Sequence, residues 1–185
     1  WADASDISRA ALLGSSVLVA ASPGLVRGRW SETLILAAMA AETFLAVGGV
    51  TALAKAAVRR ERPYLYNTDL GLEERLAAGV DPRGSFISGH ATAAFAAAAF
   101  VSRVATDMYG PSTGTKLVWA ASLSLAALTA CARVEAGLHF PTDAVVGAAA
   151  GFAIGYLVPA LHRRGRSDRL TVAVGPGFVG VGLRF

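Results

Sequence analysis

The residue types best suited to chemistry lie in three short clusters, and one of them pairs an imidazole with a carboxylate. In the segment Arg133-Val-Glu-Ala-Gly-Leu-His139-Phe-Pro-Thr-Asp143, His139 and Asp143 stand four residues apart where a helix is expected to begin. At this spacing the carboxylate can bond one ring nitrogen and leave the other free to attack, as in an activated nucleophile with an orienting group. A hydrogen bond that only stabilises the helix start is the alternative.

A second cluster, Gly84-Ser-Phe-Ile-Ser88-Gly89-His90, comes directly before an alanine-rich segment. Ser88 is a good N-cap for a helix that begins there. The free amides and the positive dipole at a helix N-terminus favour phosphate, and Gly89 lets the backbone approach it closely. His90 would face the same place, although a lone histidine at a helix start is more often structural.

Cations form the remaining cluster, Lys55-Ala-Ala-Val-Arg-Arg-Glu-Arg62-Pro63. Lys55 and Arg62 are seven residues apart, or about two helical turns, so their side chains lie on one face. Cations at the end of an apolar helix are costly unless they bind an anion. The alternative is side chains that reach toward the membrane edge. We interpret Arg59 and Arg60 in that way, as surface or headgroup contacts.

Five apolar stretches must position these clusters. None alternates with a period of two, and each approaches the roughly 20 residues that a helix needs to cross a bilayer. We expect a helix in each of them, at Ile7–Ser22, Thr33–Val58, His90–Ala105, Leu117–Ala132 and Ala144–Leu161. Pro23-Gly24 is expected to end the first helix and Pro63 to follow the second. The segment Tyr64–Gly84 is expected to form a long, functional polar loop.

The clusters fall at helix ends that share one face of an up-and-down bundle. The cationic cluster ends the second helix, the Ser88 cluster begins the third, and the His139 cluster joins the fourth to the fifth. We therefore predict an all-α fold, an up-and-down bundle of about five to six apolar helices. Two histidines, one aspartate, one lysine and two arginines would converge at one end of this bundle.

Residues 170–185 differ from the rest of the chain. Leu-Thr-Val-Ala-Val is followed by Gly-Pro-Gly and then by Phe-Val-Gly-Val-Gly-Leu-Arg-Phe, which suggests two short strands around a turn. We expect a helical domain over residues 1–169 and a short β-like tail over residues 170–185 that forms a hairpin docked on the helices. A disordered tail and a partner-binding strand are the alternatives.

Composition favours a membrane-associated chain. Of the 185 residues, 54% are hydrophobic and 16% are charged, against about a quarter charged in soluble domains. The net charge is +4 without a basic stripe interleaved with aromatics, so nucleic acid is a poor partner. The single cysteine, Cys131, excludes an internal disulfide. Because the chain begins at Trp1 without methionine, we expect an upstream signal peptide or helix.

Taken in order, the three clusters resemble a known family. Lys-x6-Arg-Pro, Ser-Gly-His and Arg-x5-His-x3-Asp look like the motifs of the type-2 phosphatidic acid phosphatase superfamily, which also includes bacterial nonspecific acid phosphatases and vanadium haloperoxidases. The resemblance runs from Lys55 to Asp143, about half the chain. Ile87 stands where the family commonly has proline. Ala132 stands where it has serine, which removes a hydroxyl that could steady the phosphate.

The resemblance implies a role for each matching residue. His139 would attack phosphorus, oriented by Asp143, and His90 would protonate the departing oxygen and then activate water. A second group would bind the phosphoryl oxygens and comprises Lys55, Arg62, Ser88, Gly89 and Arg133. The resemblance implies no metal and no cofactor, because fixed cations would offset the charge of the phosphate.

The chain is therefore expected to be a phosphatase that hydrolyses a phosphomonoester or diphosphate of a lipid through a phosphohistidine, with a phosphorylated lipid and the membrane as partners. Apolar helices would place the pocket at a membrane surface. The alternatives are a vanadate-dependent haloperoxidase, a soluble periplasmic nonspecific acid phosphatase on the same core, and a helical membrane scaffold with an incidental anion site.

Eight basic residues lie on the side of the bundle away from the clusters, at Arg27, Arg29, Arg103, Lys116, Arg163, Arg164, Arg166 and Arg169. The cluster side has as many, but three of these would bind phosphate, and it also holds most of the acidic residues. Cytoplasmic loops of membrane proteins are enriched in lysine and arginine. The clusters are therefore expected to face the periplasm or the cell exterior. His162 lies in the basic end and is interpreted as interfacial.

Overall fold

Five long helices make up most of the computed structural model, which describes residues 1–69, 81–167, 169–175 and 178–184 and, within these, side chains up to residue 162. The all-α prediction is confirmed, and each apolar stretch lies within one helix. The long helices are α1 (Ala2–Arg27), α2 (Trp30–Val58), α4 (Gly89–Tyr109), α5 (Thr113–Glu135) and α6 (Pro141–Ser167), and a short 3-10 helix, η1 (Pro63–Tyr66), follows α2. Polar caps carry the helices beyond the apolar stretches; for example, Ser112 and Thr115 form a capping box before α5.

Pro23 does not end α1, contrary to the sequence-based expectation. The helix continues to Arg27 and ends at Gly28, whose φ of 64° is easily adopted by glycine. A proline inside a helix frees backbone groups on either side of it. Here α2 supplies a partner, because the N–H of Gly24 donates to Thr33 Oγ1 at 2.8 Å.

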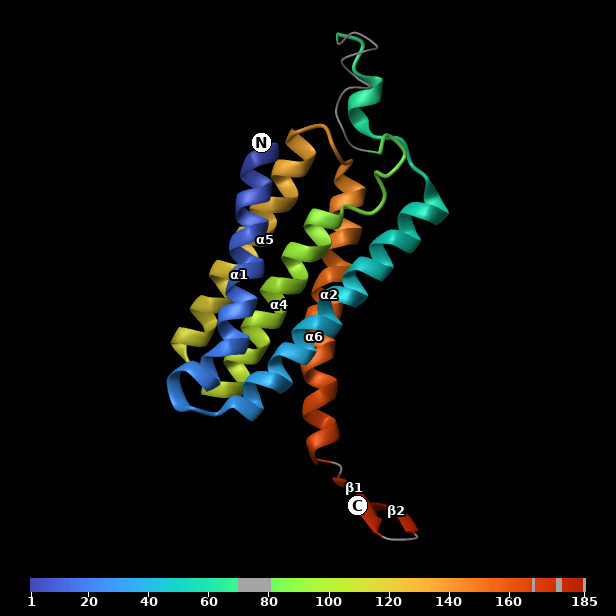
Figure 1. Ribbon diagram of the computed structural model, residues 1–185. Helices are drawn as coiled ribbons and strands as arrows, with labels where there is room; N and C mark the ends of the chain where they lie inside the picture. Colours follow the sequence, from blue (N-terminus) through green and yellow to red (C-terminus); the bar gives the residue numbers. More distant parts are fainter. Residues whose placement is uncertain (70–80, 168, 176–177, 185) are drawn as a thin grey trace.

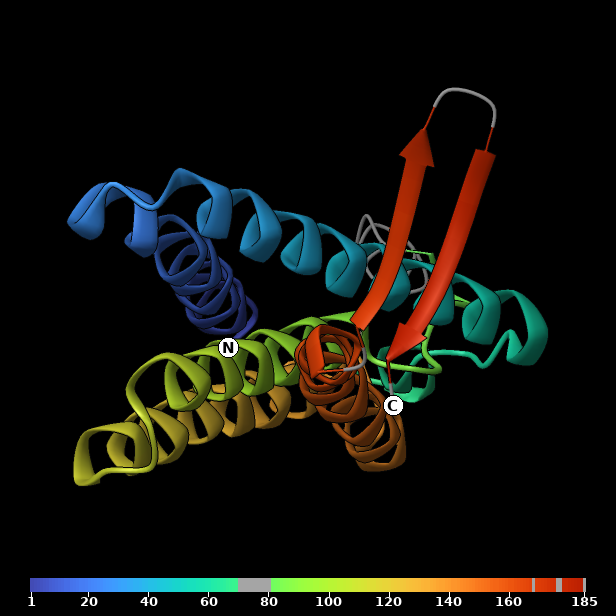
Figure 2. The same ribbon diagram turned by 90° about the horizontal axis from the view of Figure 1, so that it is seen from below.

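Helix α4 forms the centre of the bundle. It contacts α1, α2, α5 and α6, which surround it in Figures 1 and 2. The alanine-rich run explains this position, because small side chains let several helices approach at once. Ala94, Ala96–Ala99 and Phe100 have no exposed surface.

A stripe of three glycines fixes α6 against α4. Gly147, Gly151 and Gly155 recur every fourth residue, so they share one face of α6. A Cβ atom at Gly151 would lie 2.0 Å from the carbonyl oxygen of Thr92, and one at Gly155 would lie 2.1 Å from that of Ala96. The two backbones are therefore in direct contact. This close packing sets the position of the first residues of α6 relative to the start of α4.

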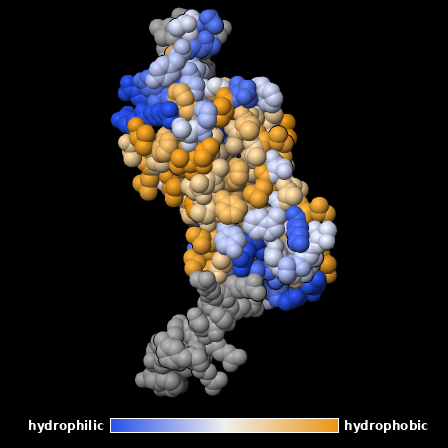
Figure 3. Space-filling view, turned by 180° about the vertical axis from the view of Figure 1, so that it is seen from behind, coloured by the Kyte–Doolittle hydropathy of each residue, from blue (hydrophilic) through white to orange (hydrophobic). Residues whose placement is uncertain are grey.

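The outer helices expose apolar side chains. Leu18, Leu45, Leu128 and Val145 are each about two-thirds or more exposed. Among the described residues, four helical segments are long and apolar enough to cross a bilayer, namely Ala2–Arg27, Trp30–Tyr66, Thr113–Glu135 and Pro141–His162. On the face drawn in Figure 3, apolar residues dominate the middle and hydrophilic residues gather toward the two ends. This distribution suits a bundle whose ends meet water.

The two ends of the bundle differ in content. The end of α2, the start of α4, the end of α5 and the start of α6 lie together at one end, near the N-terminus (Figure 1). The other end contains the α1–α2 and α4–α5 connections. The sequence clusters are thus collected at one end, as the up-and-down topology predicts. The predicted polar loop is described except for residues 70–80.

The C-terminal segment forms a hairpin beyond α6. Strands β1 (Arg169–Gly175) and β2 (Phe178–Arg184) pair antiparallel, with Arg169 opposite Arg184. Within the described part of the chain, the hairpin contacts only α6 outside itself, and it projects away from the other helices (Figure 1). The structure therefore does not show the docking on the bundle that the sequence suggested. The domain boundary at residue 169 stays a prediction.

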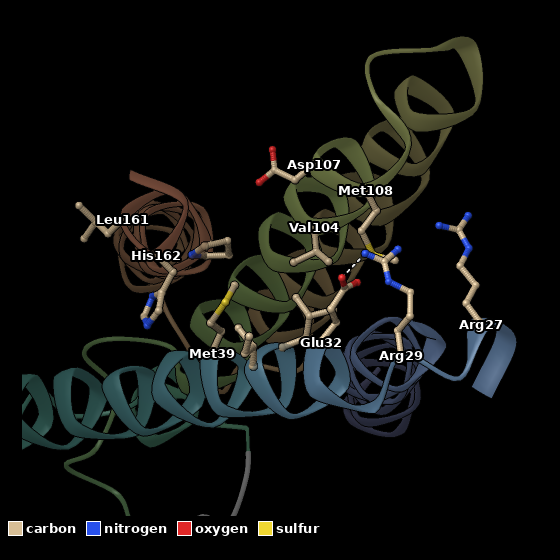
Figure 4. A pocket seen from close by; sticks show the side chains of 12 residues that line it. Arg27, Arg29, Glu32, Met39, Val104, Asp107, Met108, Leu161 and His162 are labelled. Carbon is tan, nitrogen blue, oxygen red and sulfur yellow. Dashed lines mark hydrogen bonds and ion pairs between the residues drawn. The ribbon is translucent and has the colours of Figure 1, made fainter. Parts of the chain in front are cut away.

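A cavity of about 890 Å³ opens between α2, α4 and α6 at the end away from the clusters (Figure 4). Three of the charged residues that line it are paired: Arg29 bonds Glu32, and Asp107 bonds Arg103, which does not line the cavity. His162 also lines it, with Nε2 3.4 Å from Glu42 Oε2. None of the clustered polar residues is among those that line this cavity.

Candidate active site

His139 lies in the short connection between α5 and α6 and is 2% exposed. The turn before it needs Gly137, whose φ of 67° suits glycine. His139 Nδ1 lies 2.7 Å from the carbonyl oxygen of Ser85. A carbonyl only accepts hydrogen bonds, so Nδ1 bears the proton and Nε2 keeps a lone pair. Nε2 lies 3.3 Å from Nη1 of Arg62.

The surroundings of His139 keep its ring neutral. Burial is the main cause that lowers the pKa of His139 to about 3, followed by the positive charge of Arg62. The charges of Arg133 and Lys55 act in the same direction, while the hydrogen bond to the Ser85 carbonyl opposes them. A neutral imidazole with an unprotonated Nε2, which here accepts a hydrogen bond from Arg62, is the form that a nucleophile requires.

Asp143 does not bond His139 directly, contrary to the role expected from the four-residue spacing. Its Oδ2 lies 4.0 Å from His139 Nδ1. The fully buried carboxylate instead accepts from Ser85 Oγ at 2.5 Å and from the N–H of Phe140 at 3.0 Å. The spacing rule holds within a helix, but α6 begins at Pro141, so His139 precedes it. Asp143 and His139 are therefore linked through Ser85, whose hydroxyl bonds the carboxylate and whose carbonyl bonds the ring.

Arg60 contributes to this arrangement and was missed from the sequence. Its Nη1 donates to Asp143 Oδ1 and to Thr142 Oγ1, each at 2.8 Å, and its guanidinium lies 3.9 Å from the ring centre of Phe140. The side chain is partly exposed, as the interpretation of a surface contact requires, but it also ties the end of α2 to the start of α6, which that interpretation did not include. Arg60 and Asp143 are 83 residues apart, so no local pattern signals the pair.

Arg62 is 4% exposed and is largely engaged by the backbone. Its guanidinium donates to the carbonyl oxygens of Asp81, Gly84 and Leu138 at 2.8–3.2 Å. Three of the five N–H groups of an arginine are thereby used. Arg62 thus joins the loop before α4 to the loop before α6, and the second N–H of its Nη1 is available to Nε2 of His139.

The charge of Arg133 acts on both imidazoles. It is 6% exposed; its Nη1 donates to Ser5 Oγ at 3.2 Å, and its buried Nε has no partner among the described residues. An unpartnered guanidinium N–H in a buried position favours an anionic ligand. Lys55 is half-buried, and its charge acts on His139 as that of Arg133 does.

Ser88 and Gly89 occupy the start of α4 as predicted. Ser88 is fully buried, and its Oγ accepts from the N–H of Ala91 at 3.4 Å, which makes it the N-cap. Its own N–H donates to the backbone carbonyl of Asp143 at 3.1 Å. Ser88 therefore joins the starts of α4 and α6. Hydrogen bonds from Ser88 and Gly89 to a phosphate stay a prediction.

His90 faces α1. Its Nε2 lies 2.6 Å from Oδ1 of Asp6, a residue that the sequence analysis did not single out. Burial and then the charge of Arg133 lower the pKa of His90, while the hydrogen bond to Asp6 raises it. Because the charge of Arg133 acts on both His90 and His139, the two imidazoles share one cationic neighbour.

The helical bundle and its cationic, imidazole-containing end define the class of protein: an all-α protein with a candidate site for a phosphate-like anion. The sequence profile of the PAP2 superfamily matches residues 32–167, and the chain belongs to this superfamily. The resemblance of its three motifs to type-2 phosphatidic acid phosphatases is thus confirmed.

A solved structure has the same fold. It is the crystal structure of the first transmembrane PAP2 type phosphatidylglycerolphosphate phosphatase from Bacillus subtilis, with 22% sequence identity and a TM-score of 0.62. The similarity covers 88% of this chain and 74% of that one. The comparison with curated proteins found no match.

Proposed function

We propose that this chain is a membrane-bound phosphatase that hydrolyses a phosphomonoester or diphosphate of a lipid through a phosphohistidine on His139. The observation that carries the proposal is the state of that ring. Its Nδ1–H is held by the carbonyl of Ser85, and its Nε2 lone pair lies beside the guanidinium of Arg62. Nε2 is therefore the attacking atom.

In the first step a bond forms between Nε2 of His139 and phosphorus, and the bond from phosphorus to the lipid oxygen breaks. The cations Lys55, Arg62 and Arg133 stabilise the charge that develops on the phosphoryl oxygens. A protonated His90 gives its proton to the departing lipid oxygen. Fixed cations serve here in the role that a metal ion fills in other phosphatases.

In the second step water attacks the phosphohistidine. The now neutral His90 takes a proton from the water, the new P–O bond forms, and the N–P bond to His139 breaks. Inorganic phosphate leaves, and both imidazoles return to their starting states. Asp143 supports both steps by holding Ser85, whose carbonyl fixes the tautomer of His139.

A lipid substrate is favoured by the apolar exterior. The four candidate spans would place the cluster end of the bundle at the edge of a bilayer, where a phosphorylated headgroup lies. The structural relative is by its title a phosphatidylglycerolphosphate phosphatase, which is consistent with this class of substrate.

Trapping the intermediate tests the proposal. Purified protein in detergent is mixed with a ³²P-labelled lipid phosphate and quenched in alkali, in which phosphohistidine is stable. The wild-type protein is expected to become labelled, and the His139→Asn variant is expected to remain unlabelled. A metal chelator is expected to leave the turnover of the wild-type protein unchanged. Near-normal turnover by His139→Asn would refute the proposed nucleophile.

We also propose that the cluster end faces the periplasm or the cell exterior. Arg83 is exposed at this end and Lys116 at the other, so cysteines placed there report the two sides. With Cys131 replaced by serine, an impermeant thiol reagent added to intact cells is expected to label Arg83→Cys and not Lys116→Cys. The reverse pattern would contradict the orientation.

A further inference from the structure

Helix α1 brings a carboxylate to the candidate site from outside the part of the chain that matches the superfamily. The match begins at residue 32, whereas α1 ends at Arg27. Asp6 on α1 lies with its Oδ1 2.6 Å from Nε2 of His90. The family match thus assigns nothing to the partner of the proposed general acid.

The position of Asp6 is fixed by the residues around it. Ser5 accepts a hydrogen bond from Nη1 of Arg133 at 3.2 Å, and the Oγ of Ser8 lies 2.7 Å from Oγ1 of Thr129. Ser5 is fully buried and Ser8 nearly so. These two contacts join the first turns of α1 to the last turns of α5, so that the carboxylate between them is held beside His90.

We propose that Asp6 is a positioning residue for His90. Its carboxylate accepts a hydrogen bond from Nε2 of His90, so that Nδ1 of His90 is the atom that gives a proton to the departing lipid oxygen. This inference rests on the proposed function. A carboxylate that accepts from Nε2–H fixes the rotation of the ring and stabilises its protonated form. Both effects matter because a general acid must be protonated and correctly aimed when the P–O bond breaks.

Among the described residues that act on His90, Asp6 is the one that favours the protonated imidazole. Arg133 from α5 and Arg9 from α1 both disfavour the imidazolium, and burial adds to their effect. Asp6 alone among the groups that act on the ring favours the charged form. Arg9 lies beside the same carboxylate, with Nη2 3.9 Å from Oδ1 of Asp6, so the carboxylate also offsets this cation.

The test compares Asp6→Asn with Asp3→Asn, a matched control that removes an exposed carboxylate three residues earlier on α1. With a lipid phosphate, whose alkoxide leaving group needs a proton, the rate of phosphoenzyme formation is expected to fall about 10–100-fold in Asp6→Asn and to be unchanged in Asp3→Asn. The basic limb of the pH–rate profile is expected to move to lower pH, and Asp6→Glu is expected to recover part of the rate.

A second substrate separates positioning from simple structural damage. p-Nitrophenyl phosphate has an acidic leaving group that departs without a proton, so its burst of p-nitrophenolate is expected to be nearly unaffected by Asp6→Asn. In a His90→Ala background, Asp6→Asn is expected to cause no further loss, because the two residues act as one unit.

Three outcomes overturn the inference: equal loss with both substrates, an unchanged pH–rate profile, or additive loss in the His90→Ala background. Failure of the proposed function would look different, because the wild-type protein itself would then form no phosphohistidine. The two hypotheses are therefore tested by separate signals.

Discussion

The neutral state of His139 can be tested through stability as well as activity. In the folded protein burial and the charge of Arg62 hold the pKa of His139 at about 3, whereas an unfolded histidine titrates near about 6.5. Above the unfolded pKa both states are neutral, so His139 adds no pH dependence. As the pH falls below that value, only the unfolded chain takes up the proton, and the folded protein loses stability until the pH reaches about 3.

The size of the effect follows from the two pKa values. At pH 4.5, roughly two pH units below the unfolded pKa, the loss at about 1.4 kcal/mol per pH unit is about 3 kcal/mol. His139 is only 2% exposed, so solvent screening reduces this value little. For a chain of this length, a change of about 3 kcal/mol lowers Tm by roughly 6–12 °C.

The substitution His139→Asn isolates the effect. The asparagine amide can still donate to the Ser85 carbonyl, but it does not titrate. Thermal unfolding in detergent is measured for both proteins at pH 7.5 and pH 4.5, and other titrating groups affect the two alike. The wild-type protein is expected to lose roughly 6–12 °C more than the variant. Equal losses would show that the imidazole is protonated in the folded state, and the assignment of an unprotonated Nε2 would fail.

Two further substitutions test the packing and the missed ion pair. Gly151→Ala would place a methyl group 2.0 Å from the Thr92 carbonyl and is expected to cost about 1–3 kcal/mol, measured through Tm. Gly14→Ala, in the interior of α1 with open space around it, is expected to stabilise the protein slightly, by about 0.5–1 kcal/mol. Arg60→Ala removes a donor from the fully buried Asp143 and is expected to cost about 1–3 kcal/mol and to lower turnover, with partial recovery in Arg60→Lys. Unchanged Tm in Gly151→Ala would contradict backbone contact between α4 and α6; unchanged turnover in Arg60→Ala would remove Arg60 from the site.

The sequence alone determined the helices and the end of the bundle where the polar clusters meet. Helices of bilayer length are specified by long apolar segments bounded by polar residues, and these signals are local. Short connections between neighbouring helices then alternate their direction, so Lys55, His90 and His139 must fall at the same end. The catalytic roles of these residues stay predictions.

Only the tertiary structure decided which partner each charged group takes. The local spacing predicted that Asp143 would bond His139. In the folded chain Asp143 instead bonds Ser85 and Arg60, and His139 bonds the backbone carbonyl of Ser85. His90 is likewise paired with Asp6, 84 residues away. A hydrogen bond forms only within a few tenths of an ångström of its ideal length. Its partners therefore depend on how closely distant helices pack, which here is set by small residues such as Gly151, and no local pattern encodes that distance.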